Sequence, residues 1–200
     1  MTVAAPPTPL HADRVHRIGT EAAFALGGVI REVEETQGAQ VIRCNIGQPD
    51  FPLAEHIRSA VKRAVDRGLT TYCDPQGIPE LRRAVAHSVG ERNGLDIDPE
   101  RVVIYPGGRP AIGFAHMAYS EAGEEVIYPS PGYPLFESFI PYFRCTPVPL
   151  VLREEEGFGL GRDQLEPLLS DDTGLIFLNF PSNPTGGVAT REQLTELSEL

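Results

Sequence analysis

The sequence predicts an α/β fold, a three-layer sandwich in which a mostly parallel β-sheet is flanked by helices. Short apolar runs rich in β-branched residues alternate along the chain with amphipathic segments of helical period, as expected for strands joined by helices. Turns rich in glycine and proline follow several of these apolar runs directly. The chain has 200 residues, of which 41% are hydrophobic, and this is enough to bury the core of a globular protein.

The first half of the chain is predicted to be mainly helical after a proline-rich arm at residues 4–9. Apolar residues at helical spacing predict a helix over residues 53–68 that is closed by Gly68, and a second helix that opens at Pro79. A β-branched run predicts a strand at residues 101–105. The segment 110–120 is then predicted to be a helix with Pro110 in its first turn.

The second half repeats the order of strand, turn and helix. Strands are expected at residues 124–129, at 144–152 with the character of an edge strand, and at 174–178 as the most buried strand of all. Thr190 and Gln193 form a capping box that begins a last helix over residues 190–200. Because the apolar positions of this helix continue to Leu200, we expect the natural chain to be longer.

Charge and cysteine content exclude several classes of protein. A formal net charge of -11 argues against a nucleic-acid partner, which would need a surplus of Lys and Arg. The three cysteines lack CxxC spacing, so neither a disulfide framework nor a metal site is expected. The longest apolar run, AAFALGGVI, is about half the ~20 residues that a membrane span requires. We therefore expect a cytoplasmic protein without membrane contact.

Unusual loops follow three of the predicted strands: PGGRP at residues 106–110, PSPGYP at 129–134 and NFPSNPTGG at 179–187. In parallel α/β sheets, ligands bind beyond the carboxyl ends of the strands. The three loops are therefore expected to converge on one ligand site.

The first loop is a candidate phosphate site. Gly107 and Gly108 allow a sharp turn and a close approach of the backbone, and the next helix offers free N–H groups at its positive end. Pro110 has no N–H, so Gly108 and Arg109 are the better donors. The alternative is a plain glycine turn between a strand and a helix.

The other two loops each present one candidate side chain. Tyr133 stands between prolines, where its ring is placed to stack on a flat heteroaromatic ligand, although a core tyrosine is the simpler interpretation. Asn183 stands between Ser182 and Pro184 and offers an amide N–H to a ligand oxygen. Its alternative role is to close an Asn-Pro turn.

Two further motifs lie upstream. NIGQPDF at residues 45–51 is an extended turn rich in glycine and proline, and Tyr72, Gly77, Leu81 and Arg82 have the spacing Y-x4-G-x3-LR. By themselves these motifs indicate only a loop and the entry to a helix.

Taken together and in this order, the motifs from GQPDF to SNPTG resemble the class I/II aminotransferases, which are fold-type I enzymes that use pyridoxal 5'-phosphate. The resemblance covers nearly all of the chain after the arm, and SNPTG is its most specific motif. It implies that residues 1–45 form an N-terminal arm and a segment of a small domain. Residues 46–200 would then be the N-terminal part of the cofactor-binding large domain, which is incomplete.

The resemblance implies a role for each candidate in cofactor binding. Asn183 would donate to O3′ of the pyridoxal ring, Tyr133 would stack on that ring, and the backbone N–H groups of Gly108 and Arg109 would hold the phosphate. Many relatives have a hydroxyl residue in this phosphate loop. The Arg109 guanidinium suits phosphate and is a possible replacement for that contact.

Two upstream residues are assigned roles in the same way. Tyr72 would reach the phosphate of the neighbouring subunit's cofactor, which implies a homodimer with shared active sites. Gly47 would lie against the substrate carboxylate through its backbone.

Transamination also needs a lysine that forms the Schiff base with the cofactor. Lys62 is the only lysine, and it lies among charged residues of an amphipathic helix, so we interpret it as part of a solvated face. The resemblance places the Schiff-base lysine, the aspartate that pairs with the pyridine nitrogen and the arginine that binds the substrate carboxylate beyond Leu200. We therefore expect no catalytic residue in these 200 residues and no turnover by them alone. The complete protein would exchange an amino group between an amino acid and a 2-oxo acid.

Three alternatives stay open at this stage. A carbon-sulfur lyase or another fold-type I enzyme shares most of these motifs. A non-catalytic aminotransferase-like module of a transcription regulator is a second alternative, although the short arm before Gly47 leaves no room for a DNA-binding domain. A dinucleotide-binding domain is disfavoured because PGGRP lacks a third glycine. The amino donor is also open, with aspartate, alanine and aromatic amino acids among the candidates.

Overall fold

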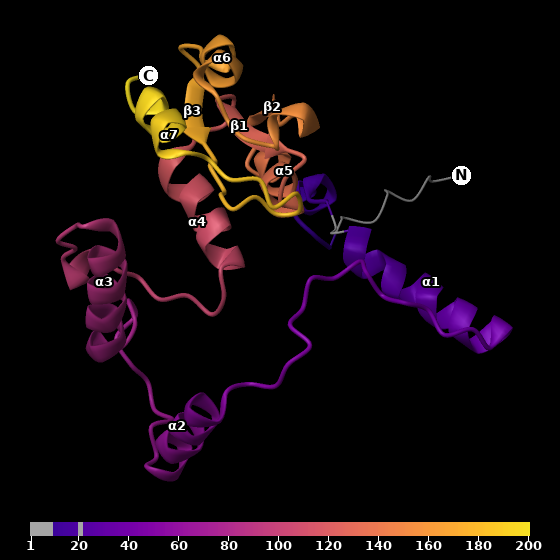
Figure 1. Ribbon diagram of the computed structural model, residues 1–200, viewed down its shortest axis with the longest axis vertical. Coiled ribbons are helices and arrows are strands. Elements are labelled where there is room, and N and C mark those ends of the chain that lie inside the picture. Colours follow the sequence, from indigo (N-terminus) through magenta and orange to yellow (C-terminus); the bar gives the residue numbers. More distant parts are fainter. Residues whose placement is uncertain (1–9, 20–21) are drawn as a thin grey trace, which may run out of the picture. The chain divides into compact units, whose positions relative to one another are not determined.

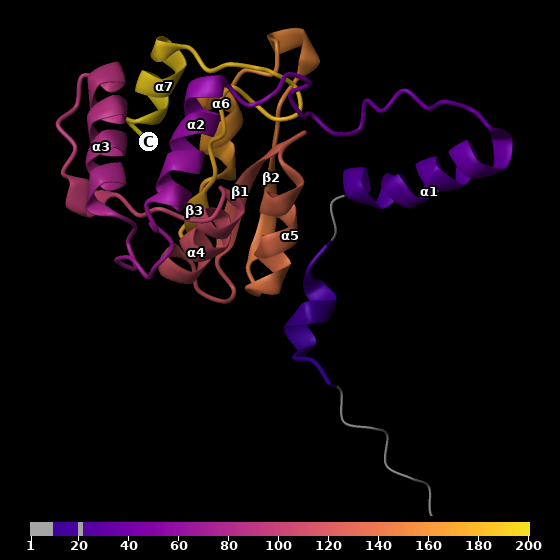
Figure 2. The same cartoon turned by 90° about the horizontal axis from the view of Figure 1, so that it is seen from below.

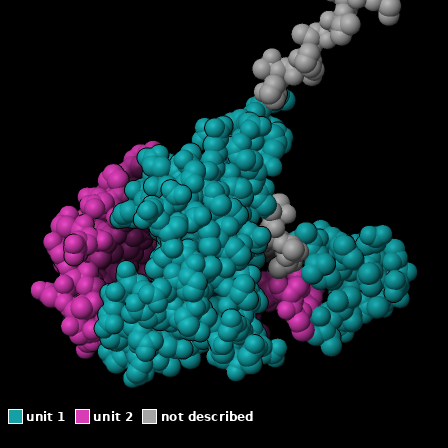
Figure 3. All heavy atoms as spheres, turned by 90° about the horizontal axis from the view of Figure 1, so that it is seen from above, with its two compact units in different colours: residues 1–42, 109–200 teal, residues 43–108 magenta. Residues whose placement is uncertain are grey.

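The computed structural model describes residues 10–19 and 22–200, so the arm predicted at residues 4–9 lies outside the described residues. The chain forms two compact units, shown in different colours in Figure 3. We call residues 43–108 the helical unit, and the described part of residues 1–42 together with residues 109–200 the sheet unit. This division does not test the domain boundary predicted between residues 45 and 46, which stays a prediction.

The sheet unit is built on three parallel strands in the order β2-β1-β3 (Figure 1). Their bounds are β1 Glu125–Ser130, β2 Thr146–Val151 and β3 Thr173–Ile176. The edge position predicted for β2 is confirmed. The prediction that the strand at residues 174–178 would be the most buried is wrong, because β1 lies between the other two strands and its four central residues are all buried.

Alternation along β1 divides the core between the two faces of the sheet. Val126 and Tyr128 pack on one face with Phe136 and Ile140, whereas Ile127 packs on the other face with Leu150 and other leucines. Successive side chains of a strand point to opposite faces, so a run that is apolar at every position is buried on both. The run VIY therefore requires cover on both faces of the sheet.

Helices provide that cover. The sheet unit contains α1 Ala22–Gln37, α4 Arg109–Tyr119, α5 Pro134–Tyr142, α6 Arg162–Leu165 and α7 Arg191–Leu197, with 3-10 turns η1 Asp13–Arg17, η3 Glu154–Glu156 and η4 Glu166–Leu168. Helices α4 and α5 lie side by side (Figure 2), and α5 packs on β1 and β2. The predicted helix that begins at the Thr190–Gln193 capping box is confirmed, and it ends at Leu197.

The turn from α5 into β2 has an unusual residue in the left-handed region. The Cys145 N–H donates to the Ile140 carbonyl and the Arg144 N–H to the Pro141 carbonyl, which is the hydrogen-bond pattern of a Schellman motif. Arg144 has φ 64° at the position in this motif where glycine is usual. The turn is therefore formed with an arginine in a conformation that disfavours a Cβ atom.

The helical unit contains α2 Glu55–Asp66, α3 Pro79–Asn93 and η2 Pro99–Arg101, and it confirms both helices predicted for this part of the chain. The strand predicted at residues 101–105 is wrong, because residues 102–105 pair with no strand. The Ile104 N–H instead donates to the Gln76 carbonyl at 2.8 Å. The β-branched run thus lies against the turn before α3 and not in the sheet.

Apolar burial is sparse in the helical unit. The three large apolar residues among the positions that predicted α2, Ile57, Val61 and Val65, are all exposed. Only Arg82, Ala86 and Gly90 are buried between residues 43 and 108.

Within the described residues, no helix is both long and apolar enough to span a membrane.

Candidate functional site

The loop after β3 holds Asn183 in a closed turn. The Ser182 N–H donates to the Gly187 carbonyl at 2.7 Å, and the Gly186 N–H donates to the Ser182 carbonyl at 2.7 Å. The Asn183–Pro184 peptide bond within this turn is cis. Asn183 is exposed, whereas Ser182 beside it is buried. The turn therefore fixes the backbone of Asn183 and leaves its side chain accessible to a ligand.

The two glycines that end this loop have different functions. Gly186 has φ 75°, a conformation that side chains with a Cβ atom rarely adopt. Gly187 lies so close to Phe158 that a Cβ atom there would overlap the Phe158 carbonyl oxygen. The glycine pair in NPTGG is thus required by the turn and by its contact with the neighbouring segment.

The loop after β1 presents Tyr133 in a similarly constrained way. Gly132 is needed because a Cβ atom there would overlap the Pro129 carbonyl oxygen. Tyr133 is the N-cap residue of α5, and Pro134 follows at the first helical position. The Tyr133 ring makes an edge-on contact with Phe136, with 5.9 Å between ring centroids. A half-buried ring is thereby held at the carboxyl end of the central strand.

Arg109 and Tyr133 are brought together by the fold. The Arg109 Nε donates a hydrogen bond to the Tyr133 hydroxyl at 3.1 Å, although 24 residues separate them. Arg109 is the first residue of α4, an 11-residue helix whose first-turn N–H groups precede the first intrahelical hydrogen bonds. An anion near this helix end would meet N–H donors and the positive end of the helix dipole.

The two glycines before α4 suit a close approach by a ligand. Gly107 has φ 94°, and its N–H donates to the Tyr105 carbonyl at 2.8 Å. No described atom lies within 4 Å of the place where a Cβ atom of Gly108 would stand. The backbone of Gly108 is therefore open to a ligand.

The loops after β1 and β3 leave the sheet at the same edge, because the two strands are parallel neighbours. Arg109, Tyr133 and Asn183 all belong to the sheet unit. The other candidates, Gly47, Tyr72 and Gly108, belong to the helical unit, where Tyr72 is fully exposed. Lys62 is exposed on α2, in agreement with a solvated helix face.

His116 is a buried polar residue that the sequence reasoning did not single out. It lies on α4 with its ring stacked on Phe143 at 5.2 Å between centroids, and its Nδ1 is 3.4 Å from the Ser120 hydroxyl. Burial lowers the pKa of His116 from 6.5 to about 4. The neutral ring is thus part of the core. The apolar residues around it on α4, such as Ile112, were the available signal.

Metal binding has no support in this part of the chain. Across residues 10–19 and 22–200, no three His, Cys, Asp or Glu side chains are grouped so that they could hold a metal ion.

Comparison with known proteins shows the family of this chain. The chain belongs to the aminotransferase class I and II family, whose model matches residues 39–200. The resemblance predicted from the motifs is thereby confirmed. An aspartate/prephenate aminotransferase of Cereibacter sphaeroides is 35% identical over 189 residues, which are 94% of this chain and 47% of that protein.

Solved structures agree in fold. The aspartate aminotransferase of Thermus thermophilus, determined with maleate, has a TM-score of 0.90 at 31% identity and matches 96% of this chain and 50% of its own. An alanine aminotransferase of Pyrococcus furiosus has a TM-score of 0.89 at 30% identity, over 94% of this chain and 48% of its own. The α/β fold with a parallel sheet flanked by helices is thus shared with these enzymes. The chain spans about half the length of the relatives it matches.

Proposed function

We propose that the protein is a cytoplasmic, pyridoxal 5'-phosphate-dependent aminotransferase that exchanges an amino group between an amino acid and a 2-oxo acid. The observation that carries the proposal is the Arg109–Tyr133 hydrogen bond. It joins the head of α4, where a phosphate would bind, to an anchored aromatic ring at the end of the central strand. Such a pairing of anion donors with a ring is what a phosphorylated aromatic cofactor requires.

The described residues fit this cofactor. Tyr133 offers a half-buried ring, Asn183 offers an accessible amide on a closed turn, and Gly108 leaves its backbone uncovered. Aromatic rings stack favourably when offset, and amide N–H groups donate to a phenolic oxygen. Ring stacking, oxygen binding and phosphate binding therefore each have a candidate residue.

The proposed roles follow the family pattern. Tyr133 stacks on the pyridine ring, Asn183 donates to its O3′, and Gly108 and Arg109 bind the phosphate. The Arg109 side chain already contacts Tyr133, so its guanidinium is positioned near the ring and complements its backbone N–H. Tyr72 serves the cofactor of a neighbouring subunit in a homodimer, and Gly47 lies against the substrate carboxylate.

When bound, the cofactor supplies an electron sink that makes the substrate Cα–H bond acidic. A lysine must move the proton, and we propose that it lies in a segment beyond residue 200, together with the aspartate and arginine of the family pattern. Lys62 is excluded from this role in the proposal, because it is exposed on the solvated face of α2. The 200 residues by themselves are expected to bind cofactor weakly and to show no turnover.

The substrate is chosen by residues outside this cofactor cradle. The relatives found by comparison are named for aspartate, prephenate and alanine, although about half of each aligns with the same chain. A panel of acidic, small and aromatic amino donors with 2-oxoglutarate is the appropriate assay. Release of ammonia and a thiol from cysteine-type substrates would instead favour the carbon-sulfur lyase alternative.

Asn183→Ala tests the proposal. In the protein at its natural length, we expect about a tenfold weaker cofactor affinity and a shifted visible absorption band, because one charge-assisted hydrogen bond is lost. Asn93→Ala, an exposed asparagine at the end of α3, is the matched control. An unchanged spectrum and affinity in Asn183→Ala would contradict the proposed role.

The intact mass of the protein from its natural source tests the missing lysine. A mass well above 21.8 kDa is expected. A natural mass of 21.8 kDa would mean that a partner supplies the lysine or that the protein has a non-catalytic role.

A further inference from the structure

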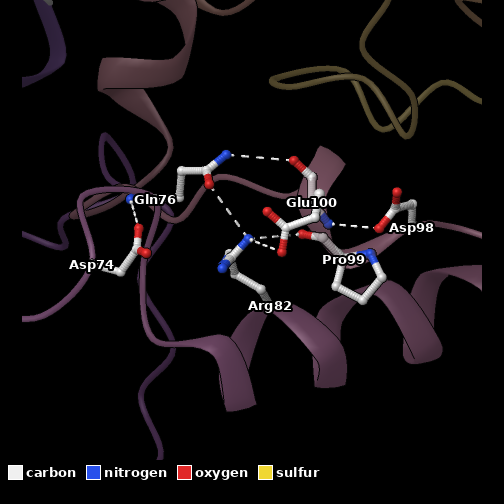
Figure 4. A network of polar contacts seen from close by, with 6 residues as sticks. All are labelled: Asp74, Gln76, Arg82, Asp98, Pro99 and Glu100. Carbon is white, nitrogen blue, oxygen red and sulfur yellow. Dashed lines mark hydrogen bonds and ion pairs between the residues drawn. The ribbon is translucent and has the colours of Figure 1, made fainter.

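Arg82 is a charged side chain buried inside the helical unit. Its side chain is only 6% exposed, and its terminal NH1 forms an ion pair with Glu100 Oε1 at 3.1 Å (Figure 4). A buried guanidinium is costly unless it is paired and hydrogen-bonded. Neighbouring Arg83, in contrast, is 59% exposed and pairs with Glu80 on the same helix. The burial of Arg82 therefore indicates a role that Arg83 does not have.

The hydrogen bonds of Arg82 connect two segments that are distant in sequence. NH1 also donates to the Gln76 side-chain oxygen at 3.5 Å and to the Pro99 carbonyl at 3.4 Å. The Gln76 amide in turn donates to the Glu100 carbonyl at 3.4 Å. Figure 4 shows the guanidinium between the turn that precedes α3 and the 3-10 turn η2. Arg82 thus ties these two turns to α3.

Each turn is independently shaped by an aspartate. Asp74 accepts a hydrogen bond from the Gln76 N–H at 2.9 Å, and Asp98 accepts one from the Glu100 N–H at 2.9 Å. These bonds fix the backbone at Gln76 and Glu100, whose side chains contact Arg82 (Figure 4). Each turn that supplies an acceptor to the guanidinium therefore has a side-chain hydrogen bond of its own.

Contacts of the Gln76–Gly77 turn extend this network toward the loop that contains Gly107 and Gly108. The Ile104 N–H donates to the Gln76 carbonyl at 2.8 Å. A Cβ atom at Gly77 would lie 2.6 Å from the Ile104 side chain, so the two segments are in direct contact. Gly108 follows Ile104 by four residues, and Tyr72 precedes Asp74 by two residues.

We propose that Arg82 is a positioning residue for cofactor phosphate. It holds the segment that carries Tyr72 and the segment that leads to Gly108 at a fixed spacing, through Gln76 and Glu100. This inference rests on the proposed function, in which Tyr72 and Gly108 are both phosphate contacts. In that proposal Tyr72 contacts the cofactor phosphate of the neighbouring subunit, and Gly108 contacts the cofactor phosphate of its own subunit. The Arg82 network therefore positions one phosphate contact in each of the two active sites.

A purely structural role for Arg82 makes a different prediction. If the network only stabilised the helical unit, its loss would lower the affinity for every ligand by a similar factor. If it positions phosphate contacts, only the phosphate-dependent part of the affinity falls. Pyridoxal 5'-phosphate and pyridoxal differ by the phosphate group alone, and their ratio of dissociation constants separates the two roles.

The experiment titrates both ligands into the cofactor-free protein at its natural length. Arg82→Met keeps the aliphatic volume and removes the donors, and we expect the dissociation-constant ratio of pyridoxal to pyridoxal 5'-phosphate to fall about tenfold. Glu100→Gln should lower the ratio less, because the Glu100 side chain is 70% exposed. Arg82→Lys should restore part of the ratio, and Arg83→Met should leave it unchanged.

Each other outcome overturns a specific claim. An unchanged ratio in Arg82→Met with both ligands weakened equally would leave Arg82 a structural residue only. If Arg82→Met does not fold, Glu100→Gln and Gln76→Leu make the same test, and an unchanged ratio in both would reject the positioning role. A wild-type protein without preference for the phosphorylated ligand would overturn the proposed phosphate contacts of Tyr72 and Gly108, and the positioning role with them.

Discussion

The sheet unit and the helical unit are held together by different kinds of interaction. In the sheet unit, Val126 and Ile127 of β1 are fully buried among aliphatic and aromatic side chains. In the helical unit, a guanidinium, a methyl group and a glycine occupy the three buried positions, and polar contacts of Arg82 connect the turns. Apolar burial is non-directional, whereas hydrogen bonds require specific geometry. The sheet unit is therefore expected to depend mainly on buried apolar volume, and the helical unit mainly on the hydrogen-bond partners of Arg82.

Apolar truncation should show the largest contrast between the two units. Ile127→Ala removes a fully buried side chain and is expected to lower the free energy of unfolding by about 2–5 kcal/mol in urea titrations. Val61→Ala on α2 removes a side chain that is 55% exposed, and a change within about 0.5 kcal/mol is expected. A loss above about 1 kcal/mol for Val61→Ala would mean that another segment covers the apolar face of α2 in solution.

Acid should destabilise the protein through the sheet unit. His116 has a pKa of about 4 in the folded state, below its ordinary value of 6.5, so the unfolded chain binds more protons between these pH values. The stability due to the neutral ring is complete above pH 6.5 and is lost as the pH falls from about 6.5 to 4. The loss should reach about 3 kcal/mol at most.

Urea titrations at several pH values test this contribution. His116→Gln should flatten the pH dependence of the unfolding free energy in that window. A curve in His116→Gln that equals wild type would assign the acid sensitivity to other groups.

A steric overlap with the backbone should have the next largest effect on the free energy of unfolding. Gly187→Ala places a Cβ atom against the Phe158 carbonyl oxygen, and we expect a loss of about 1–3 kcal/mol in unfolding free energy together with weaker cofactor binding through Asn183. Gly28→Ala is the control, because this helical glycine has no described atom near its Cβ position. It should be neutral or stabilising by up to about 1 kcal/mol. Equal stability of the two variants would show that the loop after β3 can shift without cost.

The smallest expected effect is a gain. Arg144→Gly relieves the left-handed conformation at the end of α5 and should raise the unfolding free energy by about 1 kcal/mol. Arg144→Ala removes the same guanidinium but keeps a Cβ atom, so no comparable gain is expected. If Arg144→Ala raised the unfolding free energy as much as Arg144→Gly, the effect would come from loss of the charge and not from the backbone conformation.

Local sequence signals predicted those elements that depend on local interactions. The capping box at Thr190, Pro79 at the start of α3 and Pro110 in the first turn of α4 all lie where they were expected. Each of these signals acts within one helical turn, through a side-chain hydrogen bond or a fixed φ angle. The order of the glycine-proline loops likewise predicted the family.

Predictions that required a partner through space were less successful. Residues 102–105 have strand propensity, but the Ile104 N–H donates to the Gln76 carbonyl, and none of the described strands pairs with the segment. The run at residues 174–178 has strong apolar character, but its edge position leaves it less buried than β1. Both errors arise because strand pairing is decided by neighbours that are distant in sequence.

By itself the sequence determined the existence of helices α2, α3, α4 and α7, the alternating α/β pattern and the candidate residues Gly108, Arg109, Tyr133 and Asn183, since these follow from local propensity and motif order. Only the tertiary structure decided that Arg109 donates to Tyr133, that β1 is central and that Arg82 is buried between two turns. The physical reason is that burial and long-range hydrogen bonds depend on which distant segments meet. Propensity and spacing carry no information on that choice.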